Sequence, residues 1–176
     1  MDSFNFKEVF PQHAGHSHPH VCIIFDILKS YRRVAFNFIR EGLYENEKCI
    51  MAVDSYHKSL ITKDFAMAGL DIEAYLQSGR FAIIDISASY ANNGGFDPDS
   101  TVEIWKDESM RAASEGFHAL RVVGEATFAL EGPDLYEKLV YYENIINQVL
   151  FKKYPFKSLC VYEKNRYPCR ESNYMT

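Results

Sequence analysis

The chain has 176 residues, 47% of them hydrophobic, and this length and composition are typical of one domain with a sizeable core. Its 24 acidic and 19 basic side chains give a formal net charge of −5, which excludes the basic surface that direct binding of DNA or RNA needs. Its apolar runs are short and its first residues resemble no signal peptide, so we expect a cytoplasmic protein without membrane contacts.

Residues 1–19 are predicted to form a flexible, histidine-rich leader that ends where the first strand begins. The segment HAGHSHPH contains His13, His16, His18 and His20. A metal site needs ligands at fixed geometry, so we expect no metal, with His16, His18 and His20 as weak candidates that otherwise act as an adventitious chelator. His20 enters the strand, where it is either a core histidine bonded to a backbone carbonyl or a pocket residue.

Short apolar runs and helical patterns alternate through the first half of the chain. The elements expected there are a strand at 21–25, a helix from 28 to 42, a strand at 49–53, a helix from about 58 to 69, a short helix at 72–78 and a strand at 81–86. Gly42 is expected to end the first helix in the left-handed conformation. Asp71 is expected to cap the short helix. The first strand is interpreted as buried.

The second half begins with SASYANNGGFDPDS, whose Asn, Gly, Asp and Pro residues predict a long loop at 87–100. The elements expected after it are a helix ending near 116, a strand at 120–123, a long helix from Pro133 and a strand at 159–162. Asp99 or Ser100 is expected to cap the first of these helices. Loops of that length are usually functional or mobile.

Strands that are apolar throughout, and not at every second residue, indicate a parallel sheet covered on both faces. The sequence therefore predicts an α/β domain over residues 20–168, with a mostly parallel sheet of about five or more strands flanked by helices. Residues 169–176 are expected to fray. Ligands of such sheets bind beyond the carboxyl ends of the strands.

The turn from Phe25 to Ser30 argues against nucleotide binding through a phosphate loop. It contains no glycine to bring backbone N–H groups to a phosphate, and Asp26 would repel the anion. The alternative role of Asp26 is a helix cap. We therefore expect no cofactor at this turn.

Glu125 follows the fourth strand and has two open interpretations. It orients a polar ligand or acts as a base, or it pairs with an arginine such as Arg121. Aromatic residues near strand ends and in the long loop are candidates for an apolar pocket, although each alone is more often packing; they are Phe25, Tyr56, Tyr90, Phe96, Phe128 and Tyr162.

Nucleophilic catalysis has little support in the sequence. No GxSxG elbow is present, and the four cysteines form no CxxC pair. The cysteines are expected to be reduced and mostly buried, with Cys160 in the core. We therefore expect a protein that is not an enzyme.

Several segments, in this order and spacing, resemble the MEDS domain, a sensory family of methanogens and methylotrophs. They are HVCIIF, FIREGL followed by EKC, SGRFAI, GGFDPD, EGFHALRVVGEATF, YYENIINQ and LCVYEKNRYP. The resemblance implies a RecA-like or KaiC-like fold that lacks the phosphate-binding loop and senses small organic compounds in signalling proteins. The recurrent polar and aromatic positions of the family match His20, Tyr90, Arg121, Glu125, Phe128, Tyr142, Glu143, Cys160 and Tyr162.

The sequence differs from that family in having Phe128 where tryptophan is common, a histidine-rich leader and no attached kinase or DNA-binding domain. We expect a ligand-sensing domain of signal transduction or transcriptional regulation. Its expected partners are a small organic ligand, a kinase or transcription regulator, and a second copy in a homodimer. The ligand-binding residues expected are His20, Phe25, Tyr90, Arg121, Glu125, Phe128 and Tyr162. The alternatives are a degenerate nucleotide-binding interaction module and a metal-dependent enzyme that uses the histidine cluster with Glu125.

Overall fold

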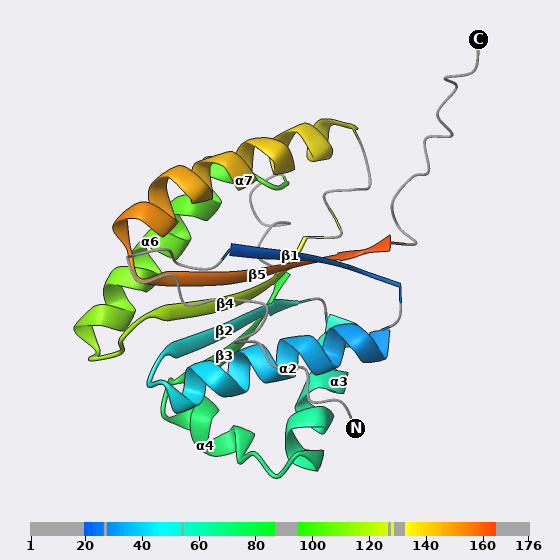
Figure 1. The fold of residues 1–176 in the computed structure, drawn as a ribbon, viewed down its shortest axis with the longest axis vertical. Helices are drawn as coiled ribbons and strands as arrows, with labels where there is room; N and C mark the ends of the chain where they lie inside the picture. Colours follow the sequence, from blue (N-terminus) through cyan, green and yellow to red (C-terminus); the bar gives the residue numbers. More distant parts are fainter. Residues whose placement is uncertain are drawn as a thin grey trace.

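The computed structural model describes residues 20–26, 28–53, 55–86, 95–126, 128 and 133–164. These ranges contain one parallel sheet in the order β1-β5-β4-β2-β3 (Figure 1). Its strands are β1 (His20–Phe25), β2 (Lys48–Val53), β3 (Phe81–Asp85), β4 (Leu120–Glu125) and β5 (Phe156–Glu163). The parallel α/β architecture expected from the sequence is confirmed, and all five expected strands are present.

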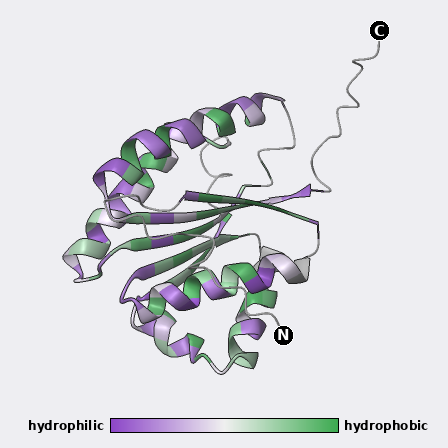
Figure 2. Ribbon diagram, viewed as in Figure 1, coloured by the Kyte–Doolittle hydropathy of each residue, from purple (hydrophilic) through white to green (hydrophobic). Residues whose placement is uncertain are grey.

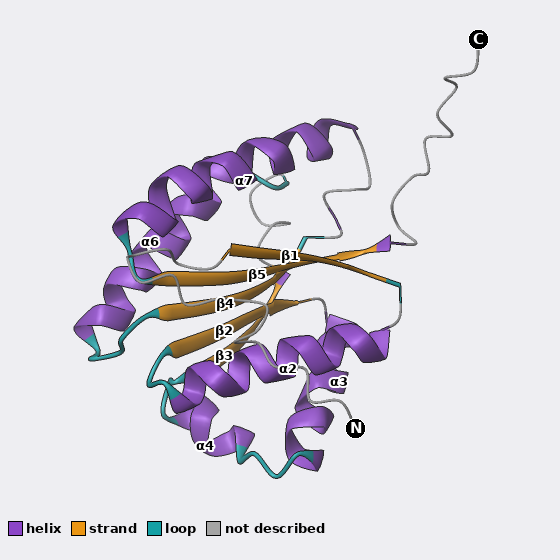
Figure 3. Ribbon diagram, in the orientation of Figure 1, coloured by secondary structure: helices purple, strands orange, loops and turns teal. Residues whose placement is uncertain are grey.

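Helices cover both faces of this sheet (Figure 3). One face carries α2 (Leu28–Tyr44), α3 (Ser55–Met67) and α4 (Ile72–Gln77), and the other carries α6 (Pro98–Ser114) and α7 (Pro133–Lys153). A separate apolar core fills each face, one around Phe38 and Phe65 and the other around Trp105 and Ile146. Figure 2 shows hydrophobic residues concentrated along the strands between these layers. Every residue of β2 is buried, as expected for a central parallel strand.

The strand β1 differs from the expected buried strand because it lies at the edge of the sheet, beside β5 alone. Its exposed residues are Cys22 and Ile24, and 60% of Ile24 is accessible. An apolar run has the same appearance in sequence whether one or two strands flank it. The glycine-free turn after β1 is therefore at the sheet edge and not at its centre.

The strand order reverses between β2 and β4. The connection through α3 and α4 leads from β2 outward to β3, whereas the connection through α7 leads from β4 the other way to β5. Open parallel sheets bind ligands beyond the carboxyl ends of the strands at such a reversal. Glu125, the last residue of β4, lies at this position.

Gly42 does not end the first helix, so that prediction was wrong. Helix α2 continues to Tyr44, and Asn46 takes the left-handed conformation with φ of 57°. A Cβ atom on Gly42 would lie 2.6 Å from Cδ of Arg121 and 2.7 Å from Sγ of Cys49. Glycine is needed here for close packing between the helix and the sheet.

Two helix caps were predicted. The cap of α4 is confirmed, since the Asp71 carboxylate accepts a hydrogen bond from the Ala74 N–H at 3.1 Å. The cap of α6 is Asp97 and not Asp99 or Ser100. Asp97 accepts a hydrogen bond from the Ser100 N–H at 2.7 Å, and Pro98 occupies the first turn, where its missing N–H costs nothing.

The expected leader, the expected tail and Tyr90 lie outside the described residues. Among the described residues, no helix combines the length and apolar character that a membrane span requires.

Candidate functional site

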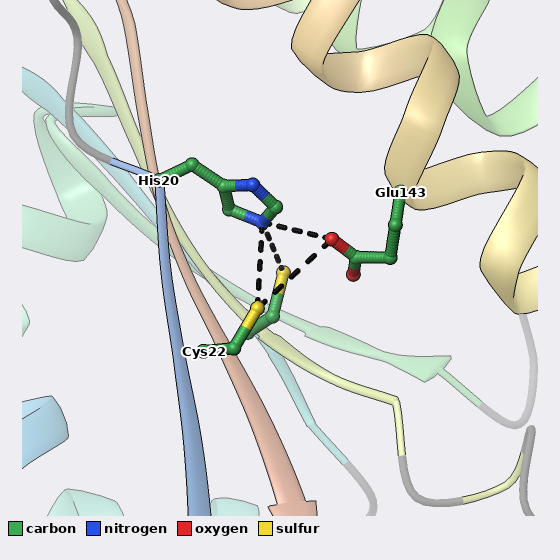
Figure 4. Close-up of side chains that lie close together, drawn as sticks. His20, Cys22 and Glu143 are labelled. Atoms are coloured by element: carbon green, nitrogen blue, oxygen red, sulfur yellow. Dashed lines mark hydrogen bonds and ion pairs between the residues drawn. The ribbon is translucent and has the colours of Figure 1, made fainter.

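Four side chains with metal-ligating or nucleophilic atoms converge on the face of the sheet beneath α7 (Figure 4). His20 and Cys22 come from β1, Cys160 from β5 and Glu143 from α7. One donor atom from each lies within 4.8 Å of the other three. We call these residues the His-Cys-Glu cluster.

Strand geometry explains how these residues meet. Side chains two positions apart on a strand point to the same face, so His20 and Cys22 both point toward α7. The parallel register places Cys22 opposite Cys160 on the neighbouring strand β5. Helix α7 packs over this face and positions Glu143 above both strands. The four residues of the cluster are therefore brought together by two features of the fold, the pairing of β1 with β5 and the packing of α7 over that pair.

The imidazole of His20 is at the centre of the cluster. Its Nε2 atom lies 3.0 Å from Oε2 of Glu143, 3.4 Å from Sγ of Cys160 and 3.8 Å from Sγ of Cys22. The Cys22 sulfur is in turn 4.0 Å from Oε2 of Glu143. In Figure 4 the labelled side chains of His20, Cys22 and Glu143 all point toward one another.

A second set of contacts orients these side chains. The Nδ1 atom of His20 lies 3.1 Å from Oδ1 of Asn147, an acceptor, so Nδ1 donates a hydrogen bond to it and Nε2 faces the cluster. The imidazole also stacks on Phe151 at 4.9 Å between ring centroids. The hydroxyl of Tyr162 donates a hydrogen bond to Oε1 of Glu143 at 2.7 Å, which leaves Oε2 facing His20.

The close approach of these groups shifts their protonation equilibria. Burial opposes the charge on His20, but hydrogen bonds to Cys22 and Glu143 outweigh it and raise the pKa of the imidazole to about 10. The hydrogen bond from the Cys160 thiol, then that from His20, overcome burial and lower the pKa of Cys22 to about 5. The same bond and complete burial raise the pKa of Cys160 well above its usual value.

The carboxylate of Glu143 remains ionised in this environment. Burial favours its neutral form, but hydrogen bonds from His20 and Tyr162 outweigh burial and lower the pKa of Glu143. Burial first, and then electrostatic interactions with Cys160 and with the Glu143 carboxylate, raise the pKa of Tyr162, so its hydroxyl remains a donor. These shifts favour the charged forms of the His20 imidazole, the Cys22 thiol and the Glu143 carboxyl group.

A small cavity of about 20 Å³ adjoins the cluster over the carboxyl halves of β4 and β5. Its lining residues come from the strands β2, β4 and β5, from the helices α6 and α7 and from the segments beside them; they are Ala52, Phe96, Trp105, Val122, Gly124, Glu125, Ala126, Phe128, Leu139, Tyr142, Ser158 and Cys160. Phe96 contacts the rings of Phe128 and Tyr142 edge-on, at 5.3 and 5.5 Å between centroids. Cys160 belongs to both the cavity wall and the His-Cys-Glu cluster.

Arg121 lies near the amino end of β4, away from Glu125 at the carboxyl end. Its guanidinium forms ion pairs with Glu47, Glu41 at 3.2 Å and Glu45 at 3.1 Å. It also donates a hydrogen bond to the Phe38 carbonyl at 2.9 Å. Arg121 therefore joins the carboxyl end of α2 to the sheet, at the opposite end of β4 from Glu125.

The structure brings together four of the seven predicted ligand-binding residues. His20 and Tyr162 lie in or against the cluster, and Glu125 and Phe128 line the cavity. Phe25 stacks on Tyr31 at 4.7 Å in the core of the opposite face. Of the other two predicted residues, Arg121 lies at the amino end of β4 and forms the ion pairs described above. Tyr90 lies outside the described residues, as do the weak metal candidates His16 and His18.

Reasoning from the residues alone missed the role of Cys22, Glu143 and Cys160 as one cluster. The family resemblance had marked Glu143 and Cys160, and the expected core position of Cys160 agrees with its 5% exposure. A local signal was present in the pattern His20-x-Cys22, whose spacing places an imidazole and a thiol on one face of a strand.

Comparison with known proteins confirms the resemblance stated from the sequence. The model of the MEDS family, the methanogen/methylotroph, DcmR sensory domain, matches residues 19–173. The transcriptional repressor DcmR of Methylorubrum extorquens is 26% identical over 147 residues, which are 83% of this chain and 52% of the repressor. The chain thus spans about half the length of this relative.

Two solved structures from Pyrococcus horikoshii share the fold. A KaiC-like protein superposes with a TM-score of 0.54 and 18% identity, covering 81% of this chain and 62% of that protein. A protein crystallised in complex with an unknown peptide superposes with a TM-score of 0.60 and 20% identity, covering 90% of this chain and 73% of that protein. At these identities the likeness concerns the fold, which is KaiC-like and RecA-like.

Proposed function

Because this chain belongs to the MEDS family of sensory domains, we propose that it senses a small organic ligand held in the cavity between Glu125, Phe128 and Cys160. The observation that carries the proposal is the cavity itself, which has an aromatic lining and few polar groups. Small-molecule sites typically combine such a lining with a few polar side chains that orient the ligand.

The polar groups at the cavity favour a ligand with a hydrogen-bonding or electrophilic part. The Glu125 side chain is 6% exposed at the carboxyl end of β4, and the Cys160 thiol lies on the next strand. Phe96, Phe128 and Tyr142 supply the apolar surface. A carboxylate and a thiol beside three aromatic rings suit a small compound with one polar end.

The small size of the cavity is consistent with sensing. About 20 Å³ is the space of one water molecule, so an organic ligand requires the aromatic side chains to move apart. Phe96 directly precedes the α6 cap Asp97, and its movement would reach that helix. A ligand that binds the open arrangement more tightly shifts the population toward it, which is the physical basis of a sensory response.

The output of this domain is proposed to be regulatory and not catalytic. The repressor relative supports a role in transcriptional regulation, with a transcription regulator or a kinase as the partner that receives the signal. In this proposal Glu125 orients the ligand and performs no chemistry.

Thermal unfolding of the full chain, measured with a panel of small organic compounds and metabolites, tests this proposal. A compound present at 100 times its dissociation constant adds about 2.7 kcal/mol of stability. The stabilisation by that compound should be lost in Glu125→Gln and Phe128→Ala and kept in the control Tyr136→Ala, which changes an exposed aromatic residue on α7. Absence of any stabilising compound, or equal stabilisation of all variants, would contradict the proposal.

The alternative is a nucleotide-binding interaction module that retains the RecA-like fold. The turn after β1 weakens it, since the turn lacks glycine and lies at the sheet edge. Equilibrium binding of ATP with magnesium separates the two functions. Saturable binding would favour the nucleotide module, whereas the sensing proposal expects no binding.

A further inference from the structure

We propose that His20, Cys22, Cys160 and Glu143 bind one divalent transition-metal ion of the zinc class, with one donor atom from each residue. This inference concerns the cluster, which shares Cys160 with the cavity of the ligand-sensing proposal and otherwise uses different residues. A metal site with these ligands was not expected from the sequence, where the candidates were His16, His18 and His20.

The spacing of the donor atoms fits four-coordinate geometry. Zinc lies about 2.3 Å from sulfur and about 2.0–2.2 Å from nitrogen or oxygen, so tetrahedral ligand atoms are roughly 3.3–3.8 Å apart. The four separations given above for Nε2 of His20 and Sγ of Cys22 range from 3.0 to 4.0 Å. All six pairs of donor atoms lie within 4.8 Å, so side-chain shifts of up to about one ångström would bring the four atoms to tetrahedral distances around one ion.

The chemistry of the donors selects the class of metal. Two thiolates and an imidazole are soft or borderline ligands, which favour zinc and its neighbours over magnesium and calcium. The Glu143 carboxylate adds a negative charge that completes the set. A metal ion here would bind the two cysteines as thiolates and His20 through a deprotonated Nε2, so its binding would release protons.

The second set of contacts is of the kind that metal ligands need. A metal-bound histidine generally donates its other ring N–H to a fixed acceptor, and His20 has Asn147 Oδ1 at 3.1 Å for this purpose. Tyr162 holds the outer oxygen of Glu143 at 2.7 Å and leaves the inner oxygen toward the cluster. Both orienting residues remain outside the donor set.

The cluster also has a route for an ion. Cys22 is exposed on the edge strand β1, whereas Cys160 is buried on β5. An ion can therefore approach from the sheet edge, contact the exposed thiol first and then reach the buried donors.

The test uses the full chain without an affinity tag, reduced and then freed of metal with a chelator. Co²⁺ is added first, because thiolate–cobalt bonds give a charge-transfer absorption that reports sulfur ligands. Zn²⁺ affinity follows from competition with a chromophoric chelator, and elemental analysis gives the stoichiometry. We expect one ion per chain and cobalt absorption from two thiolates.

Three variants separate this site from other causes of metal binding. Cys22→Ser and Glu143→Gln should each weaken Zn²⁺ binding at least about tenfold, comparable to the loss of a supporting contact. Cys22→Ser should also remove about half of the thiolate–cobalt absorption. Glu137→Gln, an exposed glutamate on the same helix, should bind as the unchanged chain does.

The leader histidines need their own control because they can chelate ions without a fixed site. A variant with His13, His16 and His18 all changed to alanine should keep the tight, thiolate-bound ion. The proposal is overturned if that variant loses the ion while Cys22→Ser keeps it, if no thiolate–cobalt absorption appears, or if the reduced protein takes up less than one tightly held ion. Circular dichroism of each variant confirms that it folds.

Discussion

Cys22 and Cys160 occupy paired positions on the parallel strands β1 and β5, with both sulfurs on the face beneath α7. Neighbouring strands lie about 4.8 Å apart, and this distance is within the range of Cα separations found in disulfides. The same two sulfurs can therefore hold a metal ion or form a disulfide, and the two states exclude each other.

Oxidation of the two thiols should thus depend on metal. We expect the chelator-treated protein to form a Cys22–Cys160 disulfide under mild oxidant, and the Zn²⁺-loaded protein to keep both thiols reduced. Peptide mapping by mass spectrometry detects the bond. Cys49 is the internal control and should remain reduced in both samples. It is buried on β2, and burial raises the pKa of its thiol to about 12, so little reactive thiolate is present. Equal oxidation with and without zinc would contradict this expectation.

Tyr162 should act on the metal through Glu143. Tyr162→Phe removes the hydroxyl that orients the carboxylate, and we expect Zn²⁺ affinity to fall about tenfold while the fold is retained. Tyr141→Phe is the matched control, since its hydroxyl bonds to Asp99 on the exposed surface at 3.3 Å. The measurement is chelator competition, with urea unfolding of the metal-free proteins beside it. An affinity unchanged in Tyr162→Phe would show that Glu143 needs no support.

Arg121 should contribute to stability and not to the site. Arg121→Met removes one of the two cations that pair with the buried Glu47 carboxylate, and Lys157 remains as the other. We therefore expect a loss in the free energy of unfolding below the roughly 3–5 kcal/mol of a fully unpaired buried charge, but well above that of a surface pair. Arg111→Met, which removes an exposed ion pair on α6, should cost less than about 1 kcal/mol. Urea titration compares the two. A small effect of Arg121→Met, or weaker Zn²⁺ binding by its folded form, would disagree with this assignment.

Gly42 should tolerate no side chain, although it lies within a helix. Gly42→Ala gains helix propensity of about 1 kcal/mol, but the new methyl group would overlap Cδ of Arg121 and Sγ of Cys49. Overpacking typically costs about 1–3 kcal/mol, so we expect net destabilisation in urea unfolding. Gly124→Ala is the control, because no other atom lies within 4 Å of its added Cβ. A more stable Gly42→Ala protein would mean that α2 shifts freely.

The strands were predictable because β2, β4 and β5 are buried on both faces and each contains a short run of apolar residues. The place of β1 was not, because strand order depends on which distant segments pair. The α6 cap was missed by two residues, since Asp97 and Asp99 are equally good caps in sequence and only the position of Pro98 separates them.

The two parts of the candidate site differ in how far the sequence reveals them. Glu125 is the last residue of β4, so the rule that ligands bind at carboxyl ends placed it correctly beside the cavity. The same rule applied to Arg121, the second residue of that strand, would have placed it at the opposite end. The cluster was out of reach, because Glu143 and Cys160 join His20 and Cys22 from 121 and 140 residues away.

The edge position of β1 has a consequence for biosynthesis. Among the described strands, β1 is made first and pairs with β5, the last of them in the chain. His20 and Cys22 therefore lack their β5 neighbours until β5 (Phe156–Glu163) has been translated, and contacts so distant in sequence form slowly. Metal loading through this cluster would accordingly report that β5 has joined the sheet, since a chain that ends before β5 lacks Cys160 and the strand that holds β1 in place.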